Sequence, residues 1–346
     1  MPHGRSKLGV ILVNLGTPDE PSAPAIRRYL DEFLSDPRVV DIPRLLWLPI
    51  LKLIILNVRP KKLVHNYDMI WGKHDGPIRN ITRALARRVD KLLTKRHGED
   101  IRCNVAMTYG QPSIEDAVLA HQQNGIDEYL FLPLYPQYAG ATTGAVFDAI
   151  NRTFKSRPVP DLEFIPQYHD HPRYIHALTK SIEPYHNDLD NGTHLVFSFH
   201  GLPEAQVRRG DPYAVQCSKT TQMVVHQLGL DKDQWSLTYQ SRFGPAKWLT
   251  PYTIDTMAEL PKRGKKKILV VCPGFATDCL ETLEEIKIQN RDVFMAAGGE
   301  SFRYVRALNA SADHASVIYN LIEENLEYRS HSAVASASSS TSTGGS

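Results

Sequence analysis

Short apolar runs rich in branched residues alternate with amphipathic stretches along most of this 346-residue chain. The apolar runs predict strands at 8–14, 101–107, 128–134, 162–166, 194–199, 235–239, 267–272 and 302–306. The amphipathic stretches predict helices at 23–35, 80–95, 113–123, 172–187, 212–228 and 312–327. Such alternation is typical of βαβ units, in which helices cover both faces of a parallel sheet. The pattern therefore predicts the α/β class, with ligands bound at the carboxyl ends of strands.

A weak internal repeat runs through this pattern. The sequence VNLGTP ends an early strand at 13–18, and SFHGLP ends a later one at 198–203. Likewise LPLYP at 132–136 is echoed by VVCPG at 270–274. Two similar α/β halves that face each other across a cleft would produce this repeat. Residues 330–346 are polar and of low complexity, which predicts a disordered tail.

Charge and motif content exclude several classes of function. Forty basic and 38 acidic residues give a net charge of +2, which argues against a nucleic-acid binder that relies on a global positive field. No P-loop or dinucleotide fingerprint follows a predicted strand, and the G-x-S-x-G elbow of hydrolases is absent. The four cysteines form no C-x-x-C pair, which argues against a disulfide scaffold and indicates a reducing, cytoplasmic compartment.

Residues 42–58, IPRLLWLPILKLIILNV, form the most apolar stretch of the chain. The stretch is interrupted by two prolines and two basic residues, and it is shorter than the roughly 20 apolar residues of a membrane-spanning helix. One interpretation is a helix of the core, which is the commoner arrangement for such a stretch. The other is an exposed apolar lip that contacts a greasy ligand or lies on a bilayer.

Two groups of polar residues follow predicted strands. His200 comes directly after the run HLVFSF, where a neutral imidazole can take up a proton or bind a divalent metal, or can simply be packed. Asp278, Glu281 and Glu285 have the spacing i, i+3, i+7, which places them on one face of a predicted helix. One interpretation is an acidic wall beside a metal path. The other is a helix capping box formed by Asp278 and Glu281, and the spacing alone favours this second interpretation.

The chain also carries a set of motifs that occur in a fixed order. They are VNLGTPDEPSAPAIRRYLDEFLSDPRVVDIPRLLW, LPLYPQYAGATTGAV, FSFHGLP, YQSRFGPAKWLTPYT, CPGFATDCLETLEEI and QNRDVFMAAGG. Together they resemble the ferrochelatase family, in its proteobacterial branch, from about residue 8 to about residue 325. The resemblance implies the chelatase fold, with two Rossmann-like halves, 1–168 and 169–329, around a porphyrin cleft. It also implies a lyase that inserts Fe²⁺ into protoporphyrin IX and releases two protons, the last step of haem biosynthesis.

The resemblance assigns roles to individual residues. His200 and Glu281 match the catalytic and metal-binding positions, and we expect His200 to accept a proton and hold iron transiently. Four aromatic residues match positions that line the cleft: Tyr67, Tyr109, Trp248 and Phe275. Asp278 matches an acidic neighbour that, with Glu285, is expected to guide ions or protons. Segment 42–58 matches the lip that holds the macrocycle and touches the membrane, so peripheral membrane contact is expected and nucleic acid is not.

The chain departs from the family pattern at several positions. Thr108 stands where some relatives have an arginine, so the propionate or proton role of that arginine does not carry over. Residues 139–141 and the tail lack the cysteines that hold a [2Fe–2S] cluster in some relatives. We therefore expect no iron–sulfur cluster and no other tightly bound cofactor. Cys279 replaces a histidine found in some relatives, and Lys287 and Gln289 interrupt an acidic row found in others.

Two alternatives to protoporphyrin ferrochelatase stay open. One is a chelatase for another tetrapyrrole or metal, such as coproporphyrin or cobalt. The other is a carrier that binds porphyrin or haem without catalysis. The presence of both His200 and Glu281 argues against a carrier, because binding alone needs no proton acceptor.

Overall fold

Two four-stranded parallel sheets form the centre of the molecule in the computed structural model, which describes residues 7–73 and 75–341. The first sheet has the order β2-β1-β3-β4, from β1 (Leu8–Asn14), β2 (Ile101–Met107), β3 (Glu128–Pro133) and β4 (Leu162–Phe164). The second has the order β6-β5-β7-β8, from β5 (His194–His200), β6 (Trp235–Gln240), β7 (Lys267–Val271) and β8 (Ser301–Val305). The eight predicted strands and the α/β class are confirmed, with strand ends within two residues of the prediction.

The two sheets repeat one topology. In each sheet the first strand along the chain lies between the second and the third, and every pairing is parallel. The chain therefore leaves the central strands β1 and β5 at equivalent points, which end at Asn14 and His200. Such a switch point at a carboxyl edge is where open α/β sheets bind ligands.

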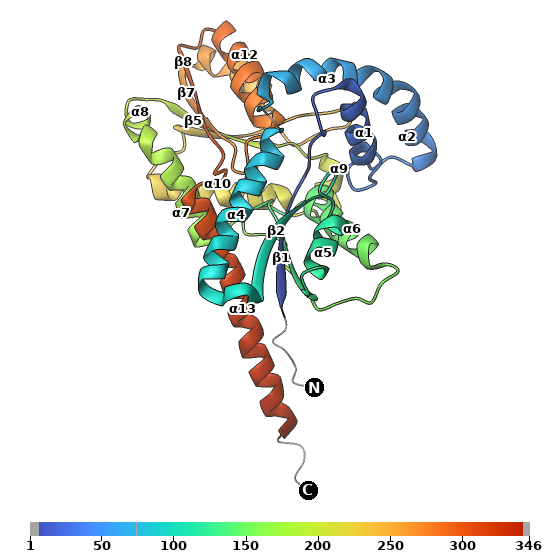
Figure 1. The fold of residues 1–346 in the computed structure, drawn as a ribbon. Coiled ribbons are helices and arrows are strands. Elements are labelled where there is room, and N and C mark those ends of the chain that lie inside the picture. Colours follow the sequence, from blue (N-terminus) through green and yellow to red (C-terminus); the bar gives the residue numbers. More distant parts are fainter. Residues whose placement is uncertain (1–6, 74, 342–346) are drawn as a thin grey trace.

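Helices cover the faces of both sheets (Figure 1). On the first half they are α4 (Pro77–His97), α5 (Ile114–Gln122) and α6 (Ala145–Phe154), preceded by a π-helix at Gly140–Gly144. On the second they are α7 (Pro172–Ile182), α8 (His186–Asp190), α9 (Glu204–Arg208), α10 (Tyr213–Leu228), α11 (Thr253–Glu259) and α12 (Arg291–Ala296). A second π-helix, Glu281–Asn290, leads into α12, and 3₁₀ turns lie at 98–100, 183–185 and 261–263. The capping box of Ser113 and Asp116 begins α5.

A helical arm stands beside the sheets at the upper right of Figure 1. It consists of α1 (Ala23–Leu34), α2 (Arg44–Ile50), a π-helix at Leu51–Ile55 and α3 (Leu56–Ile70). Trp47 and Leu51 are buried, but Leu45 is 91% exposed and Leu53 73% exposed. The interpretation of 42–58 as a core helix is therefore wrong, because only one side of this stretch packs against α1. No helix within 7–73 and 75–341 is long and apolar enough to cross a membrane.

The last helix, α13 (Ala312–Thr341), packs against α4 and α7 and so contacts both halves. The helix extends well beyond its predicted end at 327. The predicted disordered tail overlaps this helix over 330–341, its last residues, 342–346, lie outside the described part, and the tail stays a prediction. Three alanines at 333, 335 and 337 favour the extension, since alanine has the highest helix propensity and elongation needs no new nucleus.

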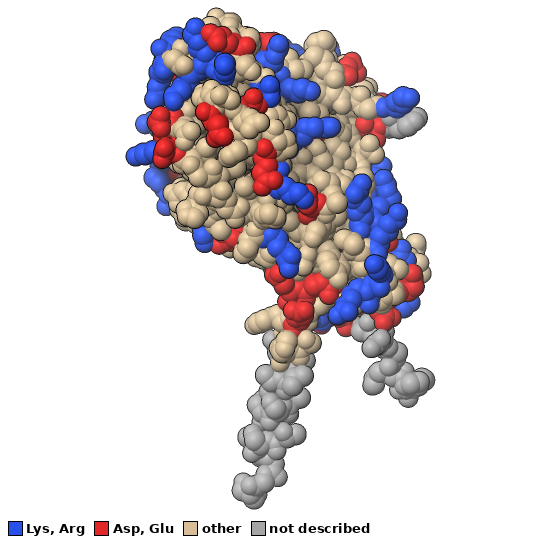
Figure 2. Space-filling view, turned by 90° about the vertical axis from the view of Figure 1, so that its left-hand side faces the viewer, with Lys and Arg blue, Asp and Glu red and all other residues tan. Residues whose placement is uncertain are grey.

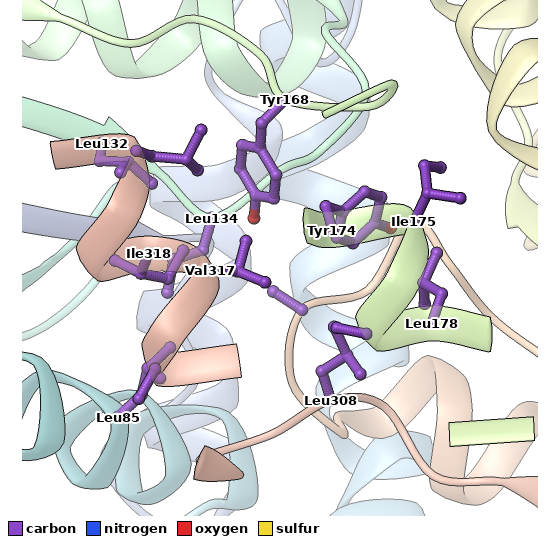
Figure 3. Close-up of a cluster of buried hydrophobic side chains, with 14 of the residues drawn as sticks. Leu85, Leu132, Leu134, Tyr168, Tyr174, Ile175, Leu178, Leu308, Val317 and Ile318 are labelled. Atoms are coloured by element: carbon purple, nitrogen blue, oxygen red, sulfur yellow. The ribbon is translucent and has the colours of Figure 1, made fainter. Parts of the chain in front are cut away.

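One apolar core joins the two sheets. Its members come from strands and helices of both halves (Figure 3), among them Leu85, Leu132, Leu134, Tyr174, Ile175, Leu308, Val317 and Ile318. The predicted boundary at 168 lies in the connection between β4 and α7, directly beside this core. The relative position of the two carboxyl edges therefore depends on side chains contributed by both halves.

Charge is unevenly distributed over the surface. Figure 2 shows Lys and Arg side chains gathered down the right-hand edge of the molecule, where α4 runs. The exposed basic residues of α4 are Arg83, Arg87, Arg88, Lys91, Lys95 and Arg96. Its acidic residue, Asp90, is bound to the Arg102 side chain and the Cys103 backbone N–H. The small net charge thus coexists with a local basic face.

We predict that acid destabilises the fold through its buried histidines. Burial lowers the pKa of His121, His194 and His314 from 6.5 to about 4. Between these values the unfolded chain binds more protons, so the free energy of unfolding falls as the pH drops from about 6.5 towards 4. The free energy of unfolding, measured by urea titration, should fall less between pH 7.5 and pH 5 in His121→Gln than in the wild type, by about 2 kcal/mol. Exposed His226→Gln is the control, and equal losses in both variants would contradict the prediction.

Candidate active site

His200 ends the central strand of the second sheet and is half-buried. Its Nδ1 atom lies 2.7 Å from the carbonyl oxygen of Gly201. Because a carbonyl only accepts, Nδ1 carries the proton in the neutral imidazole, and that tautomer leaves the lone pair on Nε2. The rings of Trp248 and Phe275 lie 6.4 and 6.5 Å from the imidazole, between centroids. The structure thus brings together three of the predicted site residues, with a proton acceptor flanked by two aromatic surfaces.

Gly201 makes this arrangement possible. A Cβ atom at this position would lie 2.8 Å from the Gln240 carbonyl oxygen and 3.0 Å from the Trp248 ring. Real Cβ atoms essentially never approach that closely, and the oxygen belongs to rigid backbone. The glycine therefore allows Trp248 and the end of β6 to close around His200.

Glu285, on the π-helix, lies near enough to His200 for the imidazole to affect the pKa of its carboxyl group. Burial raises its pKa, while hydrogen bonds from Ser241 and the nearby His200 ring partly oppose that rise. The Ser241 backbone N–H donates to Oε1 at 2.7 Å, and the Ser241 hydroxyl donates to Oε2. Sequence reasoning gave Glu285 only a guiding role. Its position four residues after Glu281 was the available signal.

Gln240, the last residue of β6, lies in a run that the sequence marks as a candidate site loop, but sequence reasoning gave it no role of its own. Its Oε1 accepts a hydrogen bond from Ser198 Oγ at 2.7 Å, and its Nε2 donates to the Glu281 carbonyl oxygen at 2.9 Å and to Glu285 at 3.2 Å. The amide therefore links β5 and β6 to the π-helix. Ser241 follows with φ 63°, a left-handed conformation that costs free energy outside glycine and aims its N–H at Glu285.

Glu281 begins the π-helix and lines a small cavity of about 20 Å³. Tyr29, Tyr67 and Thr17 also line this cavity. Burial and then the charge of Glu281 raise the pKa of the Tyr67 phenol, so the two predicted site residues lie near one another. The prediction that Asp278, Glu281 and Glu285 share one face assumed α-helical spacing. Residues 281–290 instead form a π-helix, a conformation frequently found at functional sites.

Tyr109 lies in the core of the helical arm. It is fully buried, its hydroxyl donates to Asp36 at 3.0 Å, and its ring packs against Phe33 with centroids 5.1 Å apart. Thr108, beside it, donates from Oγ1 to the Asn14 carbonyl oxygen at 3.2 Å. These contacts tie the end of β2 to the arm and to β1. The structure groups Tyr109 with the arm and not with the His200 ring.

Asp278 is completely buried and its carboxylate is fully engaged. Five donors surround the two oxygens: Tyr304 Oη, Asn309 Nδ2, Arg306 Nε, the Ala307 backbone N–H and Thr282 Oγ1. The π-helix has Leu280 as its N-cap, with no side-chain cap bond, so the capping box of Asp278 and Glu281 is not formed. The structure therefore places Asp278 against the loop after β8.

No three His, Cys, Asp or Glu side chains converge as a metal site anywhere in the described ranges. The assignment of His200 and Glu281 as transient ligands of iron stays a prediction. A wider hollow of about 540 Å³ lies on another side of the π-helix, with Lys287 and Arg291 among its lining residues. Ile70 lines both this hollow and the small cavity beside Glu281.

Comparison with known proteins decides the family. The ferrochelatase family model matches residues 7–326. Ferrochelatase of Methylococcus capsulatus is 49% identical over 322 residues, which are 93% of this chain and 97% of that protein. The chain belongs to the ferrochelatase family. Ferrochelatase 2 of Shewanella oneidensis is 49% identical over 93% of this chain and 98% of its own length. Coproporphyrin III ferrochelatase of Streptococcus mutans is 45% identical over 93% of this chain and 99% of its own length.

Solved structures show the same fold at low identity. Sirohydrochlorin chelatase SirB from Bacillus subtilis subspecies spizizenii, in complex with cobalt, has a TM-score of 0.54 at 9% identity. The match covers 93% of this chain and 96% of that one. SirB from Bacillus subtilis with Fe³⁺ has a TM-score of 0.53 at 11% identity, and the match covers 92% of this chain and 95% of that one. The predicted chelatase fold is thereby confirmed.

The helical arm of this member of the ferrochelatase family contacts the second half of the molecule. The Arg59 guanidinium of α3 lies 4.7 Å from the centroid of the Phe243 ring, in the loop after β6. Burial lowers the pKa of Arg59. Deeper in the molecule, Asn14 Nδ2 donates to Thr277 Oγ1 of the second half at 3.2 Å and to Thr82 Oγ1 at 3.0 Å. The Arg59–Phe243 contact therefore connects the arm to the second half, and the Asn14–Thr277 hydrogen bond connects β1 to it.

Removing the Phe243 ring should loosen the arm. A cation–π contact is worth about 0.5–1 kcal/mol at a partly exposed site, so Phe243→Ala should speed amide exchange at 56–66 about 2- to 5-fold. Hydrogen exchange followed by mass spectrometry measures this. Arg242→Ala is the matched control, because the Arg242 guanidinium lies over Tyr252 in the same loop and not over the arm. Equal exchange in the two variants would show that Phe243 does not hold the arm.

Proposed function

We propose that the protein inserts Fe²⁺ into protoporphyrin IX to give protohaem and two protons. The observation that carries the proposal is His200, whose neutral ring leaves the Nε2 lone pair free, near the half-buried carboxyl of Glu285 at the carboxyl edge of β5. A reaction that removes two pyrrole protons needs such acceptors. Membership of a family whose members are named ferrochelatase supports the same chemistry.

The geometry suggests how the protein's own residues act. Nε2 of His200 accepts one pyrrole proton, and the neighbouring Glu285 carboxylate stabilises the imidazolium that forms. Trp248 and Phe275, next to the imidazole, offer apolar surfaces to the flat macrocycle. Glu281 accepts or relays the second proton from the small cavity. Imidazole and carboxylate ligands hold Fe²⁺ weakly enough for it to pass to the porphyrin, whereas thiolates would retain it more tightly.

The proposal includes no resident cofactor. Burial raises the pKa of the Cys272 and Cys279 thiols, which disfavours the thiolate form that a metal or cluster requires. Coproporphyrin is the second candidate substrate, because one relative of 45% identity is named for it. Both porphyrins present a flat ring with four pyrrole nitrogens, so the roles of His200 and Glu285 would be unchanged.

Anaerobic insertion of Fe²⁺, followed by the absorption change of the porphyrin, tests the proposal. The wild type should turn over protoporphyrin IX. His200→Ala and Glu285→Gln should each lower kcat by about 10²- to 10⁴-fold, the range for a lost general base, while porphyrin binding measured by fluorescence is retained. Full turnover by His200→Ala with loss in Glu281→Gln would reverse the two roles. Binding without insertion, for coproporphyrin and other divalent metals as well, would indicate a carrier.

We propose further that this cytoplasmic protein binds membranes peripherally through segment 42–58. Leu45, Leu46, Leu53, Ile54 and Val58 are at least half exposed on one stretch of the arm. Leucine side chains at such exposure gain free energy when they enter the acyl boundary. A greasy porphyrin would reach the cleft from the same side.

Vesicle co-sedimentation tests the membrane proposal. Leu53→Ser should weaken binding to phosphatidylcholine–phosphatidylglycerol vesicles about tenfold, because it removes one apolar side chain from the inserted surface. Val159→Ser is the matched control, since Val159 is 70% exposed against 73% for Leu53 but lies between α6 and β4. Equal loss in both variants, or no binding by the wild type, would overturn it.

A further inference from the structure

The loop between β8 and α13 holds the segment that leads to Glu281. Asn309, in this loop, makes three hydrogen bonds to that segment. Its backbone N–H donates to the Ala276 carbonyl oxygen at 3.0 Å. Its side-chain Oδ1 accepts from the Asp278 backbone N–H at 2.8 Å, and its Nδ2 donates to Asp278 Oδ2 at 2.8 Å. One side chain therefore clamps both the backbone and the carboxylate of Asp278.

The conformation of Asn309 is fixed from a second direction. Its φ of 52° lies in the left-handed region, which asparagine tolerates better than most residues. Its carbonyl oxygen accepts from His314 Nδ1 at 2.5 Å, and His314 is buried at the start of α13. The clamp is thus anchored in the helix that contacts both halves.

From the clamp, contacts lead on to the π-helix. Thr282 Oγ1 lies 3.3 Å from Asp278 Oδ1, and the Cys279 backbone N–H donates to the same hydroxyl at 3.0 Å. Both contacts span the turn that contains Glu281. A buried carboxylate with all its donors in place has one favourable position, because any displacement leaves a charge unpaired in the interior.

We propose that Asn309 and Asp278 are positioning residues, which fix the first turn of the π-helix and thereby the Glu281 carboxylate. The inference rests on the proposed function. It gives Asp278 a role different from the expected guiding of ions or protons, because both of its oxygens are already engaged. The residues of the clamp act through Glu281 and do not contact substrate.

Asn309→Gly isolates the side-chain clamp, because glycine adopts the same positive φ without strain. We expect kcat to fall about 10- to 100-fold, the effect of a small misplacement of a reacting group, with the porphyrin KM within about twofold of wild type. The pH profile of kcat should keep its shape. Arg303→Gln is the control, since Arg303 lies on β8 but pairs with Asp188, and its kcat should not change.

An exchange of side chains separates positioning from proton or ion transport. Asp278→Asn should lower kcat as Asn309→Gly does. The double variant Asp278→Asn with Asn309→Asp restores the amide–carboxylate pair between the two positions, although Arg306 loses its acceptor, so its kcat should recover several-fold from that of Asp278→Asn. A residue that carries protons or ions needs its carboxylate at 278, so that role predicts no recovery. Absence of recovery in a folded double variant would overturn the proposal.

Folding and the proposed function are controlled independently. Thermal melting shows which variants are folded at the assay temperature. If Asn309→Gly is not folded, Tyr304→Phe replaces it in the kinetic test, because it removes only one donor to Asp278. Hydrogen exchange at 278–283 should be faster in the clamp variants than in Arg303→Gln. Unchanged exchange would overturn the proposal. A wild type without turnover would refute the proposed function, whereas the exchange experiment would still test the clamp.

Discussion

The shared apolar core is the constraint on which the rest of the structure depends. Two sheets that each carried a separate core could take many relative orientations, because their interface would then be a surface contact. Here Leu132 and Leu134 of the first half pack in one cluster with Leu308 and Ile318 of the second. The carboxyl edges of β1 and β5 are therefore held at one relative position. The Asn14–Thr277 hydrogen bond, the arm contact at Phe243 and the His200 site all need that position.

The sequence predicted the features that depend on local periodicity. The eight strands follow from runs of apolar residues, and His200 follows from its place directly after such a run. The family resemblance predicted an exposed lip at 42–58, whereas hydrophobicity alone left a core helix open, because it does not say which surface a side chain faces. The roles of Gln240, Ser241 and Asn309 depend on partners about 30 to 45 positions away in the chain, so neighbouring letters carry no signal for them. Spacing suggested a capping box for Asp278, and its distant donors in the loop after β8 overrode that local preference.

The two halves use one topology for different chemistry. Asn14 and His200 occupy the same position, the last residue of a central strand. The Asn14 side-chain amide donates hydrogen bonds to Thr82 in the first half and Thr277 in the second, and so joins the two halves. His200 uses one ring nitrogen for the adjacent carbonyl and keeps the other for a ligand. The repeat therefore has two equivalent edges, of which one joins the halves and the other carries the candidate active site.

The cavity beside Glu281 has a consequence for the solvent next to that carboxyl group. Its volume of about 20 Å³ is near the smallest that holds a single water molecule. Water in this cavity is therefore present as individual molecules and does not behave as a bulk phase. In the proposed reaction, a proton that leaves Glu281 on this side passes first to one water molecule in a defined position.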